Sequence, residues 1–130
     1  QISDLHFVHN RDKNKNPINI IINNNNLSSL DEISGENFFT FNNNLEEVCY
    51  YHQKDSIFMN FNNNKIRFLS SKCLYFPNII YNSIKFYYLS NNQISEISYD
   101  YFLKFIHLIE LDLSINKLNH IDPFVFSDLR

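Results

Sequence analysis

The sequence predicts a repeat solenoid in which short parallel strands are joined by loops or short helical turns. Three observations carry this prediction. Apolar residues recur at fixed distances from an asparagine, the same spacing returns after 24 residues, and apolar and polar residues alternate just before the asparagine. The alternation is the period of a strand with one buried face, and recurrence at a fixed step is typical of stacked units. One unit cannot bury its own apolar face, so about three or more must stack.

The clearest unit is centred on Asn116. Apolar side chains stand 8, 5 and 3 residues before this asparagine and 2, 5, 10 and 13 residues after it. The alternation over residues 111–113 predicts a short strand with one face buried. The apolar positions of this unit are Leu108, Leu111, Leu113, Leu118, Ile121, Phe126 and Leu129.

Two further units precede it. Asn92 lies 24 residues before Asn116, and all seven apolar offsets agree between the two units. Asn64 lies 28 residues before Asn92 and shares five of the positions, so the four extra residues are expected to form a bulge near residues 78–83. The matching residues are Ile84, Tyr87, Leu89, Ile94, Ile97, Phe102 and Phe105 around Asn92, and Met59, Phe61, Ile66, Leu69 and Leu74 around Asn64.

The pattern is weaker in the first part of the chain. Asn25 and Asn43 each have some of the expected apolar neighbours, but Thr40 stands at a position that is apolar in the other units. Residues 2–10 match only the first half of a unit. We therefore expect a single domain over residues 1–130, with degenerate repeats over 1–55 and clearer repeats over 56–130.

The segment Leu108–Asn116 follows the pattern LxxLxLxxN and resembles the leucine-rich repeat family. The resemblance is good over residues 56–130 and loose over the rest. It implies an α/β repeat solenoid shaped as a horseshoe, with short parallel strands on the concave face and short helical, 3₁₀ or loop segments on the convex face. The 24-residue length resembles the repeats of animal extracellular receptors, which slightly favours an extracellular or cell-surface location over a cytoplasmic one.

Asparagines and capping residues explain how each unit turns. An asparagine side chain carries both donors and an acceptor, so Asn64, Asn92 and Asn116 are expected to bond backbone groups from one unit to the next. Six residues after each of them stand the good N-cap residues Ser70, Ser98 and Asp122, which predict a short helix or 3₁₀ turn on the outer side. The asparagine runs 23–26, 42–44 and 62–64 are attributed mainly to an AT-rich coding composition.

The resemblance also implies a binding surface, because in this family the variable residues between the strand leucines face the concave side and read the ligand. An aromatic pair beside two carboxylates fits a basic residue of a partner, and tyrosine is enriched at interface hot spots. Equally, the two aromatic residues could reflect the aromatic-rich composition of the chain, and the two carboxylates could simply keep an exposed sheet hydrated. The residues at these positions are Phe86, Tyr88, Ser90, Glu110, Asp112, Ser114, Asn60 and Asn62.

Other chemistries find little support. Glu110 and Asp112 lie two residues apart on one strand, but no neighbouring nucleophile accompanies them, so we predict no enzyme and no cofactor. The five histidines have no zinc-site spacing. Cys49 and Cys73 occupy different positions in their units, which favours free thiols over a disulfide. Asn26 begins the one glycosylation sequon, a triplet that arises often by chance in an asparagine-rich chain.

Charge and length exclude two further classes. The net charge is −3 and the basic residues are scattered, with a single short group at 11–15, which argues against nucleic-acid binding. No apolar run approaches the 18 or more residues of a membrane span. The chain begins at Gln1 without a signal peptide and shows no cysteine-rich cap at either end, so we expect a fragment of a longer protein.

The favoured function is a protein-interaction module that binds a protein partner of unspecified identity through the concave face. One alternative is a substrate-recognition segment inside a larger enzyme or ligase-type assembly, with the chemistry elsewhere. Another is a degenerate repeat with a mainly structural role. The sequence does not define the oligomeric state, and fold alone does not give function.

Overall fold

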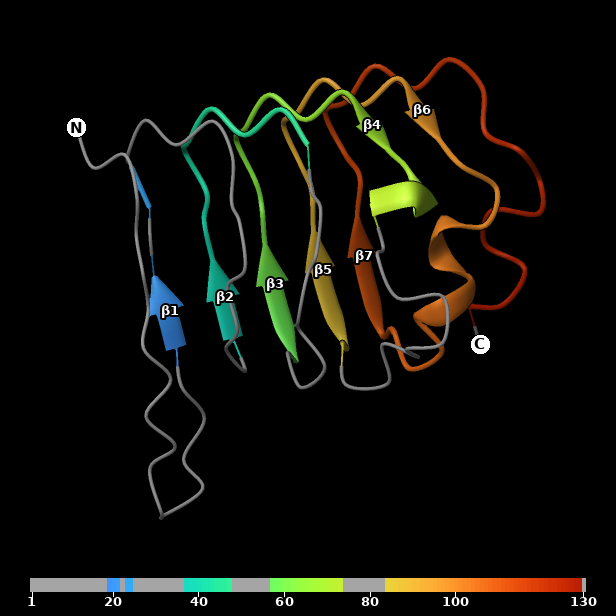
Figure 1. Cartoon of the computed structure of the whole chain (residues 1–130), viewed down its shortest axis with the longest axis horizontal. Coiled ribbons are helices and arrows are strands. Elements are labelled where there is room, and N and C mark those ends of the chain that lie inside the picture. The colour runs from blue at the N-terminus through green and yellow to red at the C-terminus, as the bar shows by residue number, and fades with distance from the viewer. Residues whose placement is uncertain (1–18, 22, 25–36, 48–56, 74–83, 130) are drawn as a thin grey trace, which may run out of the picture.

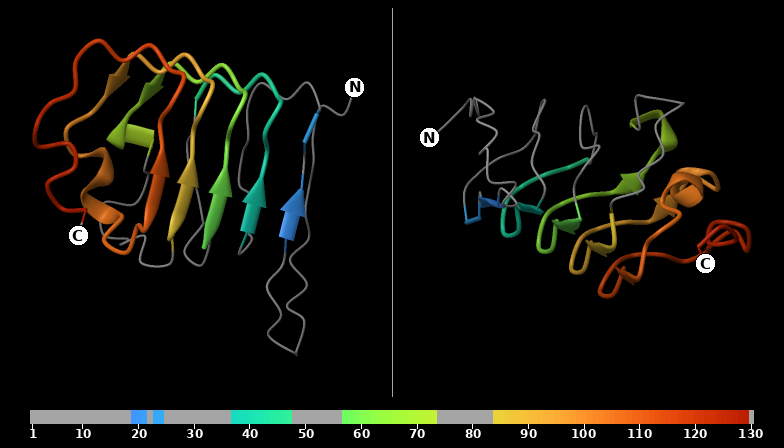
Figure 2. Two further views of the ribbon diagram at one scale, coloured as in Figure 1. Left: turned by 180° about the vertical axis from the view of Figure 1, so that it is seen from behind. Right: turned by 90° about the horizontal axis from the view of Figure 1, so that it is seen from below.

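A computed structural model describes residues 19–21, 23–24, 37–47, 57–73 and 84–129. Five short strands form one parallel sheet in which neighbours in space follow one another along the chain (Figure 1). Between β5 and β7, where the chain is described throughout, it passes along the other side of the sheet and returns to the start of the next strand (Figure 2). The strands are β1 (Asn19–Ile21), β2 (Asn37–Phe39), β3 (Phe58–Asn60), β5 (Phe86–Tyr88) and β7 (Glu110–Asp112).

The register of the sheet follows the predicted spacing. The central residues of the five strands stand side by side, and each lies at the apolar position five residues before its asparagine. The first two strands belong to the units centred on Asn25 and Asn43, where the sequence pattern was weak. The aligned residues are Ile20, Phe38, Met59, Tyr87 and Leu111.

The outer side is built from short elements. β4 (Phe68–Leu69) pairs with β6 (Glu96–Ile97) in a second parallel pair, and each strand is followed by a 3₁₀ helix, η1 (Ser71–Cys73) or η2 (Tyr101–Lys104). A 3₁₀ helix thus occurs in two of the three units in which the sequence predicts a short helical segment, turns follow Asp122 in the third, and no α-helix occurs within the described ranges. The bulge expected near residues 78–83 lies outside them.

Two of the three predicted caps are confirmed. The Ser70 hydroxyl accepts a hydrogen bond from the backbone N–H of Lys72 at 3.3 Å, at the start of η1. The Asp122 carboxylate accepts one from Phe124 at 2.9 Å and opens a run of turns. The prediction for Ser98 was wrong, because η2 begins three residues after it. Its hydroxyl instead joins two units: it donates to the Leu69 carbonyl at 3.1 Å and accepts from the Ser71 N–H at 3.2 Å.

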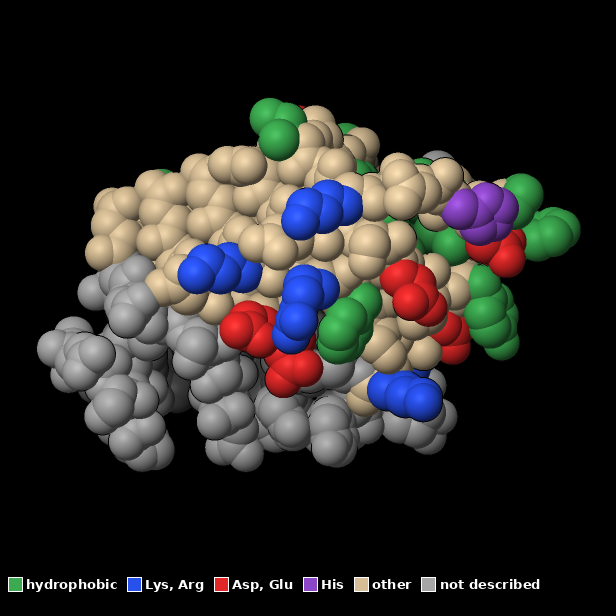
Figure 3. Space-filling model, turned by 90° about the horizontal axis from the view of Figure 1, so that it is seen from above, with side chains coloured by type: hydrophobic (Ala, Val, Ile, Leu, Met, Phe, Trp, Pro, Cys, Tyr) green, Lys and Arg blue, Asp and Glu red, His purple; other side chains and the backbone are tan. Residues whose placement is uncertain are grey.

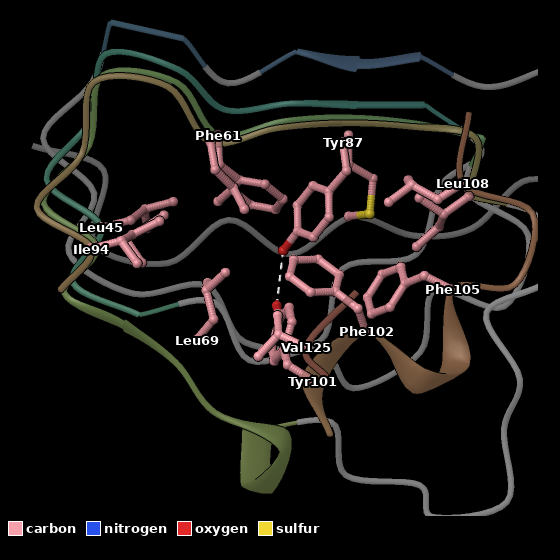
Figure 4. Close-up of a cluster of buried hydrophobic side chains, with 14 residues drawn as sticks. Leu45, Phe61, Leu69, Tyr87, Ile94, Tyr101, Phe102, Phe105, Leu108 and Val125 are labelled. Atoms are coloured by element: carbon pink, nitrogen blue, oxygen red, sulfur yellow. Dashed lines mark hydrogen bonds between the residues drawn. The ribbon is translucent and has the colours of Figure 1, made fainter. Parts of the chain in front are cut away.

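The core lies between the sheet and the outer segments (Figure 4). Aromatic side chains fill it: the Tyr87 ring stacks on Phe105 with centroids 5.6 Å apart, and the Tyr87 and Tyr101 hydroxyls hydrogen-bond each other at 2.9 Å. This pair satisfies two polar atoms that would be costly to bury alone. Each large apolar side chain that is removed from water contributes about 1.5–3 kcal/mol. The residues predicted at the core positions around Asn92 are buried or packed against this cluster.

A buried or half-buried asparagine follows β3, β5 and β7 and bonds each of these strands to the unit before. The Asn92 amide accepts a hydrogen bond from the Ile66 N–H at 3.1 Å and donates to the carbonyls of Phe61 and Leu89, both at 3.0 Å. Asn64 and Asn116 make the equivalent bonds one unit away on either side. We call these three asparagines, each of which bonds backbone groups of two successive units, the inner ladder.

Thr40 departs from the apolar pattern without breaking the fold. Its side chain is fully buried at the apolar position, and its hydroxyl accepts a hydrogen bond from the side-chain amide of Asn43 at 3.3 Å. Its carbonyl accepts another from Asn64 at 2.9 Å. A buried hydroxyl with a partner costs far less than an unpaired one, which is why threonine is tolerated here.

A second row of asparagines runs along the outside of the turns, and we call it the outer ladder. Asn24, Asn42, Asn63 and Asn91 all have positive φ, between 55° and 59°. Asparagine tolerates this left-handed conformation better than other residues with a Cβ. Their side-chain amides bond in series from unit to unit at 2.7, 2.7 and 2.8 Å. This edge is covered largely by uncharged atoms (Figure 3). The described asparagines of these runs therefore have a structural use, whatever the coding composition contributes.

The outer ladder ends at Ile115. This residue takes the left-handed conformation with φ of 52° in place of an asparagine, and its side chain is 73% exposed. A β-branched residue is strained in this conformation, at a cost of about 1 kcal/mol or more. Exposure means that burial of the side chain offsets little of this cost.

The substitution Ile115→Asn is expected to stabilise the chain by about 1 kcal/mol, because it relieves backbone strain and offers the Asn91 amide a further partner. Urea unfolding of both chains measures the difference. The matched control is Ile109→Asn, at another exposed isoleucine that is not among the residues with positive φ, and it should give no gain. Equal effects at both positions would contradict the strain at Ile115.

Candidate functional site

The side of the sheet that faces away from the core carries three rows of side chains, which we call the strand face. Parallel pairing sets the rows, because aligned residues of neighbouring strands lie about 4.8 Å apart. The first row is Phe58, Phe86 and Glu110, the second is Asn60, Tyr88 and Asp112, and the third, just after the strands, is Asn62, Ser90 and Ser114. All eight residues predicted for the binding surface thus fall in these rows.

Phe58 is the residue that the sequence reasoning missed. Its half-buried ring lies 5.1 Å from that of Tyr88, edge to face, and 5.9 Å from that of Phe86. The three rings form one cluster across β3 and β5. The signal was present, because Phe58 stands six residues before Asn64, as Phe86 and Glu110 stand before their asparagines.

Carboxylates lie beside this cluster on β7. Burial, a hydrogen bond to the Glu110 carboxylate, and the negative charges of Glu110 and Asp112 together raise the pKa of Tyr88 above its usual value of 10.0. The neutral phenol is therefore favoured, and Tyr88 couples the aromatic cluster electrostatically to the carboxylates. The two predicted components of the surface form one continuous patch.

The polar side chains of the third row, and two of the second, form hydrogen bonds within the strand face. The Asn62 side chain accepts a hydrogen bond from the Ser90 N–H at 2.7 Å, and the Ser90 and Ser114 hydroxyls bond each other at 2.9 Å. The Asn60 and Asp112 side chains each accept a bond from the backbone two residues later, at 3.0 and 2.9 Å. These polar groups fix the ends of the strands, which leaves the aromatic rings and carboxylates as the groups that can face a ligand.

The charges on the face have one sign. The ion pair that joins described residues is Arg67–Glu46, at 3.0 Å, and it lies between exposed side chains away from the strand face. Within the described ranges no basic side chain pairs with Glu110 or Asp112. Glu110 also borders an open hollow of about 240 Å³ with Leu108, Ile109, Leu111 and Leu129.

The described residues form neither a metal site nor a membrane span. In the part of the chain that is described, no three His, Cys, Asp or Glu side chains gather as a metal site would require, and His107 and His120 are exposed. No helix among the described residues is long and apolar enough to span a membrane. Asn26, Cys49 and the other three histidines lie outside the described residues, as does the side chain of Cys73.

Comparison with known families agrees with the geometry. The family model for the leucine rich repeat matches residues 88–130. This segment contains β7 and the asparagines Asn92 and Asn116, where the predicted spacing is most regular. The match supports a leucine-rich repeat in this segment, and proteins with such repeats are repeat solenoids that generally mediate protein–protein contacts. No curated protein and no solved structure matches the chain.

The contact between Tyr88 and Glu110 predicts a measurable titration. Because the pKa of Tyr88 is higher in the folded than in the unfolded chain, its contribution to stability is complete below about pH 10 and is lost as the pH rises through the raised value. An ultraviolet difference titration between the wild type and Tyr88→Phe isolates this phenol. Glu110→Gln should lower its midpoint, and the control Glu96→Gln on β6 should not. A midpoint that both variants leave unchanged would contradict the contact.

Proposed function

We propose that this chain is a protein-interaction module, a single leucine-rich repeat domain over residues 1–130 that binds a protein partner through the concave face of a horseshoe. The strand face would form that concave surface. The observation that carries the proposal is the half-buried aromatic cluster of Phe58, Phe86 and Tyr88 on a sheet whose opposite side already holds the core. The residues proposed to contact the partner are Phe58, Phe86, Tyr88, Ser90, Glu110, Asp112, Ser114, Asn60 and Asn62.

The rigidity of the sheet supports this function. Asparagine amides bond the turns after β3 and β5 on both the inside and the outside, and Asn116 bonds the turn after β7 on the inside. These bonds support a strand face whose rows keep their spacing without a ligand. A preformed surface loses little conformational entropy on binding, and this favours affinity. Aromatic residues at the centre of a patch supply most of the binding energy at many interfaces.

The alternatives are less well supported. A role as the substrate-recognition segment of a larger enzyme or ligase-type assembly would use the same face, with the chemistry elsewhere. We propose that the chain itself is not an enzyme. A purely structural role for degenerate repeats fits less well, because β1 and β2 continue the register of the sheet.

The test is affinity capture with the immobilised chain beside the variant Tyr88→Ala/Glu110→Lys. We expect the variant to lose a partner that the wild type retains, because it removes the central ring and reverses a neighbouring charge. The control Tyr99→Ala/Glu96→Lys changes the same residue types away from the strand face, where Tyr99 is 64% exposed. Capture that both variants retain or both lose would contradict binding through the strand face.

A further inference from the structure

We propose that the strand face recognises a basic side chain of the protein partner, preferentially an arginine guanidinium, held against Phe58, Phe86 and Tyr88 and paired with Glu110 and Asp112. This inference rests on the proposed function and names the chemistry of the partner. It concerns one patch, in which a continuous aromatic surface meets two carboxylates across neighbouring strands.

Charge is the first argument. The three rows of the strand face contain two acidic residues and no basic one. Elsewhere Glu46 is neutralised by Arg67, whereas no described basic side chain pairs with Glu110 or Asp112. Two carboxylates two residues apart on the same face of one strand repel each other, and a cation from outside the chain would relieve that repulsion. The patch is therefore complementary to a positive charge.

The aromatic cluster is the second argument. Cations are attracted to the faces of aromatic rings, and the attraction grows when water is excluded. Phe86 is paired in register with Glu110, and Tyr88 with Asp112, so each ring has a carboxylate as its neighbour on the next strand. A cation on these rings would thus lie one strand spacing, about 4.8 Å, from the row that carries the carboxylates.

The shape of the groups favours arginine over lysine. A guanidinium is planar, so it can stack on a ring while its N–H groups donate to carboxylate oxygens in its own plane. Tyr88 donates to Glu110 and the Ser114 N–H donates to Asp112, yet each carboxylate keeps further acceptor sites. Lysine offers a compact ammonium that cannot stack in this way, so it should bind more weakly.

The experiment is a titration of the isotope-labelled chain with hexa-arginine, followed by amide and aromatic-ring resonances. We expect saturable shifts centred on β5, β7 and the three rings, with hexa-lysine weaker and hexa-glutamate without effect. Glu110→Gln/Asp112→Asn should weaken hexa-arginine binding about tenfold, which equals about 1.4 kcal/mol. The matched control Glu47→Gln/Glu96→Gln removes the same charge from exposed residues off the strand face and should have little effect.

Two results would overturn the inference. Equal weakening by both double variants would show attraction by net charge alone, and shifts centred away from the three rings would place the cation elsewhere. Selection of random displayed peptides on the folded chain separates failure of the arginine preference from failure of the proposed protein-binding function. Peptides that bind the strand face without a basic residue would refute the arginine preference but would still support protein binding. Binding of a neutral oligosaccharide to the strand face, with no peptide selected, would refute both the arginine preference and the proposed protein-binding function.

Discussion

The side-chain amides of Asn64, Asn92 and Asn116 hydrogen-bond the turn after each of three strands to the unit before it. After every short strand the chain must turn sharply into the interior, which exposes backbone N–H and carbonyl groups that the sheet no longer satisfies. Asn92 satisfies such groups in its own unit and in the unit before it, and Asn64 and Asn116 do the same one step away. Because the bonds cross between units, the same interaction closes each turn and sets the stacking. The stacking of the units in turn keeps the rows of the strand face at a regular spacing.

The outer ladder adds a second constraint at the same turns. Each turn needs one residue with positive φ, and this sequence uses asparagine where glycine would also serve, consistent with its single glycine. Asparagine has an advantage here, because its amide can bond to the equivalent amide of the next unit. At Ile115, where the turn has no asparagine, an exposed β-branched residue is held in a strained backbone conformation.

Much of the fold could be predicted, and the missing parts have physical reasons. The spacing around Asn92 and Asn116 fixes which side chains face the core, so strands, register and inner ladder follow from it. The outer ladder could not be distinguished from compositional bias, because positive φ leaves no mark on a sequence rich in asparagine. The tolerance of Thr40 at an apolar position could not be predicted either, because it depends on the hydrogen bond that its hydroxyl accepts from the Asn43 side chain. The rows of the candidate site followed from alternation, but the contact between Tyr88 and Glu110 depends on which strands are neighbours in space.

The most direct test of this account is the free energy of unfolding of Asn92→Ala, measured together with amide hydrogen exchange at Ile66. Removing the side chain leaves the buried Ile66 N–H without its acceptor and takes one of two donors from each of the carbonyls of Phe61 and Leu89, which keep Asn64 and Asn116. We therefore expect a loss of about 1–3 kcal/mol and faster exchange at Ile66. Asn119→Ala, at an exposed asparagine, is the control and should change neither quantity. An Asn92→Ala chain that unfolds like the wild type and keeps Ile66 protected would contradict the central role of the inner ladder.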